Sequence, residues 1–396
     1  MQRNVFSVVV LCYKHFEYVK QAISSVLSQD YASVELIVSD DGSANFPKSE
    51  IESFIQENQG TNITRVLVRQ EEHNVGTVKH LNHVKEYCTG EYIAFLAGDD
   101  VFASNQVLSK YVEGFEDAPE NCYIQMAQTG MYNETLEHLE SYYLKPFVAE
   151  ALMHTTEQTD ELMHCLLLYG ACLPSTSTCF RALFFRRFGK FDEEFRLVED
   201  YPMHIRLAEE GWIIHYHNFV AIKHRHGGIS HGQSAVSTTS SNLYFSDMRR
   251  LMAISLEKSH LVSTKERKII KNKYARDILW IDFQIAKSTK DVSKLAALVL
   301  RHPCIALRKC MSKAYALYDG MQRNLLKICL LSWIIMPQSI EMFSKVTHLN
   351  TSGLTQALFG VSWALFGLWL ISWVVWIIFS IIYKNEQFPG GISYID

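Results

Sequence analysis

The sequence predicts an α/β protein with a mostly parallel central sheet, followed by a helical region and a C-terminal transmembrane helix. Three observations lead to this prediction. Short apolar runs rich in β-branched residues alternate with amphipathic stretches near the N-terminus, which is typical of βαβ units. Acidic pairs directly follow two of these runs, where open sheets bind their ligands. About thirty residues near the C-terminus carry no formal charge, and roughly 20 would span a bilayer.

Composition limits the class of protein. The chain has 396 residues, of which 48% are hydrophobic and 20% are charged, and this suits one large domain with an appendage. A formal net charge of -4 provides no overall positive field, so we expect no nucleic acid partner. The nine cysteines are scattered without the spacing of a zinc ribbon, which indicates a reducing compartment rather than a disulfide framework.

The first elements are expected to follow one another as strand, helix, strand, helix and strand. The β-branched run 6–11 predicts a buried strand, and apolar residues at helical spacing predict a helix over 18–28. Strands at 35–39 and 65–68 flank an amphipathic helix near 48–57. Neither a Gly-x-Gly-x-x-Gly motif after the first strand nor a P-loop is present, so a dinucleotide site is not expected.

The most informative stretch is 96–100, which reads Leu-Ala-Gly-Asp-Asp. A strand over 92–96 should end there, because Gly and Asp are poor strand residues, and present Asp99 and Asp100 on a loop. Adjacent carboxylates repel each other unless a cation or a hydrogen-bond donor lies between them. A hard divalent metal that holds a phosphate group is their natural partner. A solvated Asp-Asp turn is the alternative.

Two other acidic pairs complete a pattern. Asp40 and Asp41 follow the apolar run 35–39, and Glu199 and Asp200 lie further downstream. With these residues the sequence resembles the inverting family 2 glycosyltransferases of GT-A fold. The resemblance covers roughly the first 230 residues, and nothing after them carries it. The segments that match, in chain order, are 6–13, 24–29, 40–43, 74–76, 90–93 and 99–100.

The resemblance implies a site for the nucleotide of a nucleotide-sugar donor. The Asp at the position of Asp41 accepts a hydrogen bond from the base, typically uracil, so we expect a UDP-sugar. Asp40 would support the turn or the ribose side. Backbone at Leu11 and Tyr13, at the end of the first strand, would line the same pocket. An ordinary Asp-Asp-Gly-Ser turn is the alternative.

The resemblance also implies a metal site at Asp99. In the usual pattern an Asp-x-Asp triplet ends the strand, and its last Asp binds Mg²⁺ or Mn²⁺, which stabilises charge on the diphosphate leaving group. Here the triplet begins with Ala97, so the first carboxylate is missing. Without this carboxylate, the ribose contacts of the usual pattern are not expected to be the same, and the metal site is expected to be weaker. Asp100 is expected to support Asp99.

Asp200 is the expected general base. The resemblance places the base in an acidic pair such as Glu199-Asp200, and an ionised Asp can take the proton of an acceptor hydroxyl. Attack from the far side of the anomeric carbon would invert its configuration. Asp200 followed by Pro202 also predicts a helix start, preceded by a basic helix over 181–187. The two interpretations are compatible, because a capping position fixes a carboxylate in space.

The segment that begins at His224 resembles the family's Arg-His-Gly-Ser loop. Arg225 is the expected contact of the diphosphate. His226 is the expected second metal ligand, because histidine is a common ligand of metal ions. A histidine that satisfies a hydrogen bond in the core is the alternative, and His215 and His217 lie nearby in the sequence.

The apolar segment 354–383 is expected to cross the membrane once, with Trp residues at the interfaces. A buried core helix is the alternative. Basic residues are frequent before the segment and only Lys384 follows it, so the positive-inside rule predicts a cell-membrane protein whose large N-terminal part is cytoplasmic. Gly353, Gly360 and Gly367 form a small-residue stripe, which makes a homodimer through this helix a hypothesis.

Three regions follow from these patterns. They are a GT-A catalytic domain over 1–233, a basic helical membrane-surface region over 234–350, and the transmembrane helix with a short tail over 351–396. The expected activity is inverting, metal-dependent transfer from a UDP-sugar to a hydroxyl of a lipid-linked glycan in a surface-polysaccharide pathway. The expectation that the acceptor is linked to a lipid depends on the predicted membrane segment alone. A polyprenyl-phosphate glycosyltransferase and a degenerate GT-A scaffold subunit without catalysis remain alternatives.

Overall fold

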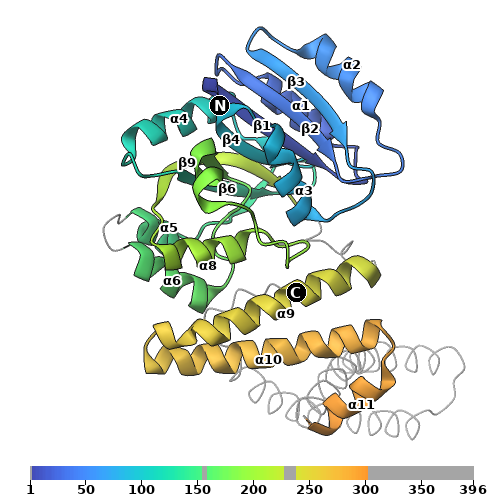
Figure 1. Cartoon of the computed structure of the whole chain (residues 1–396), viewed down its shortest axis with the longest axis vertical. Coiled ribbons are helices and arrows are strands. Elements are labelled where there is room, and N and C mark those ends of the chain that lie inside the picture. Colours follow the sequence, from blue (N-terminus) through green and yellow to red (C-terminus); the bar gives the residue numbers. More distant parts are fainter. Residues whose placement is uncertain (1, 154–157, 227–237, 302–396) are drawn as a thin grey trace, which may run out of the picture. The chain divides into compact units, whose positions relative to one another are not determined.

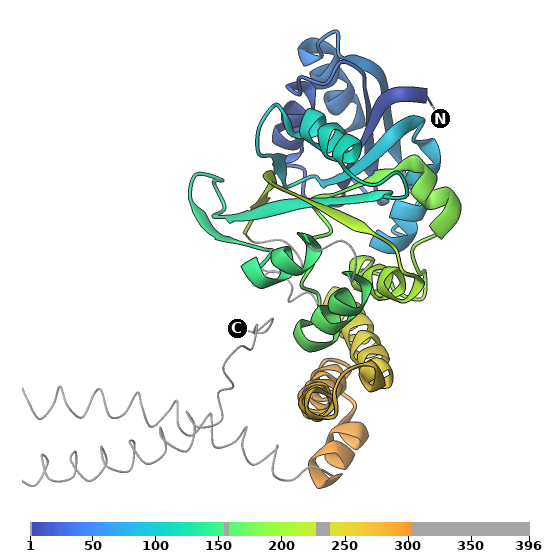
Figure 2. The ribbon, with the colours of Figure 1, turned by 90° about the vertical axis from the view of Figure 1, so that its left-hand side faces the viewer.

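The computed structural model of the protein describes residues 2–153, 158–226 and 238–301. Its contacts divide the chain into a unit of Met1–Lys290 and a unit of Asp291–Asp396. The first unit contains a nine-stranded sheet with helices on both faces (Figures 1 and 2). Of the second unit, the described part is α11 (Val292–Arg301). The domain boundaries predicted at residues 233 and 350 stay predictions.

Parallel strands form the first half of the sheet. β2 is buried along its whole length, and β1 is buried from Val5 to Val10, as expected of parallel strands covered on both faces. All four strands predicted in this half are confirmed, and each is longer than predicted. In spatial order they are β3 (Ile63–Gln70), β2 (Val34–Asp40), β1 (Gln2–Cys12) and β4 (Gly90–Ala97).

The second half of the sheet is mixed, so the prediction of a mostly parallel sheet is wrong there. β8 runs antiparallel to β4 and to β6, whereas β9 runs parallel to β6. Two short strands, β5 and β7, pair antiparallel with β9 and β6. An apolar run marks a buried strand but does not encode its direction, which is why the sequence did not predict this. The strands are β5 (Val101–Phe102), β6 (Ile124–Tyr132), β7 (Leu139–Tyr142), β8 (Thr178–Arg181) and β9 (Ile214–Arg225).

Three helices pack in one hydrophobic core with the parallel strands. They are α1 (Val19–Leu27), α2 (Lys48–Asn58) and α4 (Val107–Asp117). In α1, the buried side chains of Val19, Ala22, Ile23 and Val26 recur at helical spacing and form one apolar stripe. The helices predicted over 18–28 and 48–57 are confirmed.

A second core collects the remaining helices of the first unit. The predicted basic helix is confirmed as α7. The predicted helix start near Asp200 is confirmed as α8, but Glu199 rather than Asp200 is at the N-cap position. α9 and α10 lie side by side in both views (Figures 1 and 2), and a capping box between Ser263 and Glu266 starts α10. These helices are α3 (Thr77–Val84), α5 (Pro146–Met153), α6 (Gln158–Tyr169), α7 (Ala182–Phe188), α8 (Asp200–Glu210), α9 (Thr238–Lys258) and α10 (Thr264–Ser288).

The predicted single-pass location in the cell membrane, with a cytoplasmic catalytic part, is contradicted. Within the described ranges no helix is long and apolar enough to cross a bilayer. The two longest, α9 and α10, both carry several charged side chains. The segment 354–383, on which this prediction and the predicted homodimer depend, lies outside the described residues.

Candidate active site

The end of β1 brings the first two acidic loops to one edge of the sheet. Cys12 pairs with Asp40 across β1 and β2, and the Asp41 N–H donates to the Cys12 carbonyl oxygen at 2.9 Å. On the other side of β1, the Gly98 N–H donates to the Leu11 carbonyl oxygen at 2.8 Å. A Cβ atom on Gly98 would lie 2.9 Å from that oxygen. Only glycine therefore lets the loop before Asp99 pass this close to β1.

The chain continues from β1 toward the Asp40 turn through Tyr13 and Lys14. Lys14 has a left-handed backbone, with φ of 63°, and its N–H donates to Ser43 Oγ at 2.8 Å. Its ammonium lies 4.8 Å from the centre of the Tyr13 ring. Leu11 and Tyr13, both predicted to line the nucleoside pocket, thus lie beside the two acidic turns.

Asp40 is fully buried, and its carboxylate is used within its own turn. It accepts hydrogen bonds from the Ser43 N–H at 2.6 Å, from Ser43 Oγ at 2.7 Å and from Gln70 Nε2 at 3.0 Å. These contacts hold the turn together. A direct contact between Asp40 and a ribose remains a proposal.

Asp41 ties the same turn to the segment that precedes α3. Its carboxylate accepts from Asn74 Nδ2 at 2.8 Å, from the Val75 N–H at 2.8 Å and from the Gly76 N–H at 3.0 Å. Burial raises the pKa of Asp41, although the two backbone donors oppose that rise. Gly76 has φ of 91°, a conformation that favours glycine. Asp41 thus fixes the path of residues 74–76, which sequence analysis did not foresee.

Asp100 is buried and neutralised by the end of β9. Its carboxylate accepts the Arg225 N–H at 3.0 Å and lies 2.9 Å from His224 Nδ1. Burial lowers the pKa of His224, but the Asp100 carboxylate more than offsets this, and the pKa is raised. The Asp100 carboxylate thus favours the protonated form of the His224 ring. Asp100 therefore ties the loop after β4 to the end of β9, and its predicted role in donor binding stays a prediction.

Asp99 differs from its neighbour in both exposure and partners. It is partly exposed, and no other described residue donates a hydrogen bond to its carboxylate. Burial and the adjacent Asp100 charge raise the pKa of Asp99. A carboxylate in this situation gains from a nearby cation.

The described side chains alone do not form a metal cage. Within residues 2–153, 158–226 and 238–301, no group of three or more His, Cys, Asp or Glu side chains could hold an ion. Mg²⁺ commonly takes only one or two protein carboxylates and completes its coordination with substrate phosphates and water. The single carboxylate of Asp99 fits an ion held in that manner.

Arg225 is 4% exposed and holds several chain segments together. Its Nε donates to the Asp99 carbonyl oxygen at 2.9 Å, and one Nη donates to Gln21 Oε1 at 2.8 Å. The other Nη donates to the Glu134 carbonyl oxygen, and the guanidinium carbon lies 3.7 Å from the centre of the Tyr18 ring. The predicted diphosphate contact is thus a buried residue that positions the backbone of the Asp99 loop.

His226 lies at the end of β9, and its side chain is 59% exposed. Its N–H donates to the Tyr132 carbonyl oxygen at 2.9 Å, while its Nδ1 is 3.8 Å from Glu140 Oε2. The next residues of this loop, 227–237, lie outside the described part of the chain. His226 therefore stays a predicted metal ligand.

Glu199 and Asp200 lie at the start of α8, and both are partly buried. Asp200 accepts the Tyr201 N–H at 2.7 Å. Burial raises the pKa of both carboxyls, and the charge of Asp200 raises that of Glu199 further. A carboxylate with few donors and a raised pKa is suited to accept a proton.

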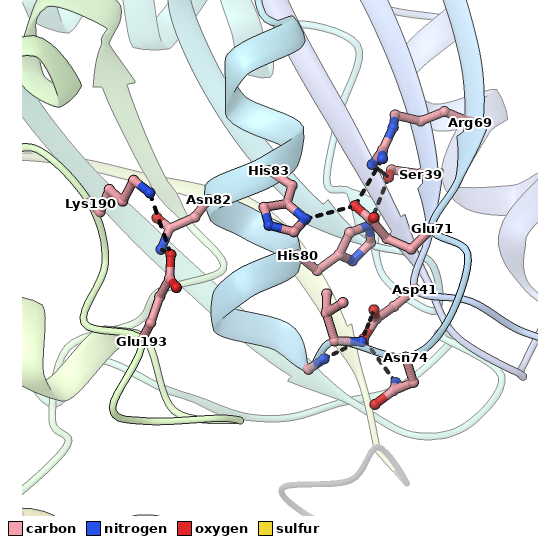
Figure 3. A network of polar contacts seen from close by, with 12 residues as sticks. Ser39, Asp41, Arg69, Glu71, Asn74, His80, Asn82, His83, Lys190 and Glu193 are labelled. Atoms are coloured by element: carbon pink, nitrogen blue, oxygen red, sulfur yellow. Dashed lines mark hydrogen bonds and ion pairs between the residues drawn. The ribbon is translucent and has the colours of Figure 1, made fainter.

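Sequence analysis missed a polar network around α3 (Figure 3). On one side of the helix, His80 Nε2 lies 2.7 Å from Ser39 Oγ, which also accepts from Arg69 Nη1 at 2.9 Å. On the other side, Asn82 exchanges two hydrogen bonds of 3.0 Å with the backbone of Phe191. α3 thus links the end of β2 to the loop that leads to Asp200. The polar residues His80 and Asn82 among the apolar positions of a short amphipathic segment were a sequence signal for these contacts.

Comparison with known proteins identifies the domain. The model of Glycosyl transferase family 2 matches residues 7–187, so the chain contains a domain of this family. The domain is that of a glycosyltransferase enzyme. Together with the mixed sheet described above, the match confirms a GT-A-like α/β fold.

Individual similarities are lower. An uncharacterized glycosyltransferase of Haemophilus influenzae is 24% identical over 228 residues, which cover 56% of this chain and 65% of that protein. An Escherichia coli protein named UDP-Glc:alpha-D-GlcNAc-diphosphoundecaprenol beta-1,3-glucosyltransferase WfgD is 29% identical over 107 residues, 27% of this chain and 40% of that one. The chain thus spans less than two thirds of either relative.

One solved structure is similar over most of its length. The mannosyltransferase PcManGT of Pyrobaculum calidifontis, in complex with GDP-Man and Mn²⁺, has 13% sequence identity and a TM-score of 0.47. The superposition covers 80% of this chain and 81% of that one.

Proposed function

We propose that the protein transfers a sugar, with inversion, from a UDP-sugar to a hydroxyl group of a lipid-linked glycan. The family 2 domain supports glycosyl transfer. One observation carries the proposal further: of the two carboxylates that follow β4, Asp100 is paired with His224 and Arg225, whereas Asp99 receives no hydrogen bond from another described residue. This division suits one carboxylate that builds the loop and one that faces a donor diphosphate with its cation.

The nucleoside is proposed to bind between the turn at Asp41 and the end of β1. Leu11 and Tyr13 would contribute backbone groups there. Three of the four lone-pair sites of the Asp41 carboxylate are taken by residues 74–76, which leaves one acceptor position for a base N–H. Asp40 would support this site indirectly, through Ser43 and Gln70.

A divalent cation, Mg²⁺ or Mn²⁺, is proposed as cofactor, with Asp99 as its protein ligand and His226 as the second candidate. When bound, such an ion neutralises charge that develops on the departing diphosphate. Arg225 would act by holding the backbone of Asp99, since its own guanidinium already donates to three protein oxygens.

Asp200 is proposed as the general base. Its position at the N-terminus of α8 fixes the carboxylate, and the Tyr201 N–H orients one oxygen at 2.7 Å. The carboxylate would take the proton of the acceptor hydroxyl while the hydroxyl oxygen bonds to the anomeric carbon from the face opposite the diphosphate. The C–O bond to the diphosphate breaks in the same step, so the configuration inverts.

The proposed acceptor is based on the name of a similar protein, and no residue of this chain identifies it. The E. coli protein similar over 107 residues is named for transfer to a sugar on diphosphoundecaprenol. A glycan linked to a polyprenyl diphosphate is therefore the acceptor class that we favour. A polyprenyl monophosphate acceptor and a scaffold without catalysis are the alternatives to be tested.

The decisive experiment is a transfer assay with purified full-length protein and Mn²⁺. It offers radiolabelled UDP-sugars with either a GlcNAc-diphospho-polyprenol or a polyprenyl monophosphate, and Asp99→Ala serves as the matched inactive variant. Product on the diphosphate-linked glycan, lost in the variant, is the expected result. Product on the monophosphate alone would replace the acceptor class, and UDP binding without any product would favour the scaffold.

A further inference from the structure

The segment that leads to Asp200 is held by a residue outside the family match. Residues 189–199 connect α7 to α8 and end at the Glu199-Asp200 pair. Asp247, on α9, is 6% exposed, and its Oδ2 accepts the Arg196 N–H at 3.0 Å and the Leu197 N–H at 2.7 Å. These two donors lie four and three residues before Asp200, whereas the match to the family ends at residue 187.

The side chain of Arg196 reaches the donor side of the site. Its Nη2 donates to Asn74 Oδ1 at 3.0 Å and to the Asn74 carbonyl oxygen at 3.2 Å. The amide of Asn74 in turn donates to Asp41 at 2.8 Å. A Cβ atom on Gly76 would lie 2.6 Å from Arg196 Cγ, so the two segments are in close contact. One residue therefore touches both the proposed nucleoside turn and the carboxylate of α9.

We infer that Asp247 is a positioning residue, which sets the place of the base Asp200 relative to the bound donor by anchoring the backbone of Arg196 and Leu197. This inference rests on the proposed function, because it takes Asp200 as the base. The carboxylate is the acceptor for two part-buried backbone N–H groups of the loop. Asn82 fixes the same loop at Phe191, so without Asp247 the loop keeps its first anchor and loses its second.

The loss of that second anchor should affect the chemical step more than donor binding. The nucleoside turn is held directly by the three hydrogen bonds between Asp41 and residues 74–76, whereas Asp247 reaches it only indirectly, through the side chain of Arg196. A displacement of about 1 Å at a reacting group can lower the rate on the order of 100-fold. We therefore expect a fall in kcat with little change in KM for the donor.

The test compares Asp247→Ala, Asp247→Asn and a control, Asp282→Ala. Both hydrogen bonds end on one oxygen of Asp247, so Asn can retain them and should rescue most of the rate. Asp282, on α10, accepts from Arg249 Nε of α9 at 2.8 Å, so its loss breaks a comparable contact of α9 away from the base loop. The expected result is a 10- to 100-fold lower kcat in Asp247→Ala, with donor KM within about threefold, and near-normal rates in the other two variants.

A second readout does not require catalysis. Hydrogen–deuterium exchange of peptides spanning 189–200 should speed up in Asp247→Ala and stay as in the parent protein in Asp247→Asn and Asp282→Ala. If the parent protein transfers no sugar, the proposed function fails, while the exchange data still decide whether Asp247 anchors the loop. Unchanged exchange, an unchanged kcat in Asp247→Ala, or an Asn variant as slow as the Ala variant would overturn the inference.

Discussion

The acidic pair at the end of β2 and the acidic pair at the start of α8 are similar in sequence but differ in the number of hydrogen bonds that they accept from described residues. Asp40 and Asp41 each accept three hydrogen bonds, half of them from backbone N–H groups. Among the described donors, Asp200 accepts the Tyr201 N–H, and burial raises the pKa of Glu199 and Asp200, as it does that of Asp41. The comparison teaches that a satisfied carboxylate organises the chain, whereas a poorly satisfied one is available to accept a proton.

The largest expected effect is a loss of activity when Asp200, in the α8 pair, is replaced. Asp200→Asn should lower kcat by about 10²- to 10⁴-fold, because the amide cannot take the proton of the acceptor. UDP binding, measured by thermal shift, should stay within about twofold because the nucleoside turn is untouched. A variant that keeps more than a tenth of the parental kcat would remove Asp200 from the role of base.

The second prediction concerns the stability of the nucleoside turn. Asp41→Ala deletes the acceptor of three hydrogen bonds and leaves the N–H groups of Val75 and Gly76 unpaired, so it should cost about 2–4 kcal/mol in the free energy of unfolding. Urea denaturation measures this cost. Asp30→Ala is a suitable control, since that side chain is exposed and accepts from the half-buried Ser109. Equal stability of the two variants would contradict the structural role of Asp41.

The third prediction uses the pH dependence of the rate. Burial raises the pKa of Asp200, and a general base works only when ionised, so kcat/KM should fall as the pH drops through this raised pKa. The acidic limb should therefore lie above the ordinary Asp pKa of about 3.9. A pH–rate profile with parallel UDP-binding measurements separates the base from donor affinity. A profile that stays flat down to pH 4.5 would argue against a shifted base.

The smallest expected effect is on stability: removing the charge of Asp200 should stabilise the protein, whereas removing Asp41 should destabilise it. A carboxyl whose pKa is higher in the folded than in the unfolded state adds stability at low pH and loses it as the pH rises through the folded pKa. Asp200→Asn should therefore raise the melting temperature by about 2 °C at pH 7 and by less at pH 4. Destabilisation at pH 7 would mean that the ionised carboxylate contributes net stability where it stands.

The sequence predicted the parallel half of the fold well, because continuous apolar runs such as that in β1 and periodic stripes such as that in α1 are local signals. It also predicted that acidic residues would follow the strand ends, since Gly98 and the two Asp residues terminate β4 in any context. The direction of β6 and β8 was not predictable, because pairing partners far apart in the chain decide it.

The different contacts of the two residues within each acidic pair could not be predicted from the sequence either. That Asp100 pairs with His224, 124 residues further on, and that Asp41 binds residues 74–76 are consequences of tertiary contacts. Asp247 lies in a helix with no motif, so nothing in its surroundings marked it. Residue type and spacing identified the candidate site carboxylates, but not which of them already accept hydrogen bonds from other parts of the protein.

The contact between α9 and the loop before Asp200 bears on how this enzyme could be divided or recombined. A fragment that ends at residue 187, where the family match stops, would lack Asp200, the proposed base, and the Asp247 carboxylate that anchors its loop. A fragment that ends at residue 233 would keep Asp200 but leave two backbone amides of its loop without their acceptor. The smallest autonomous module for swapping with relatives should therefore run to Lys290, the end of the first unit.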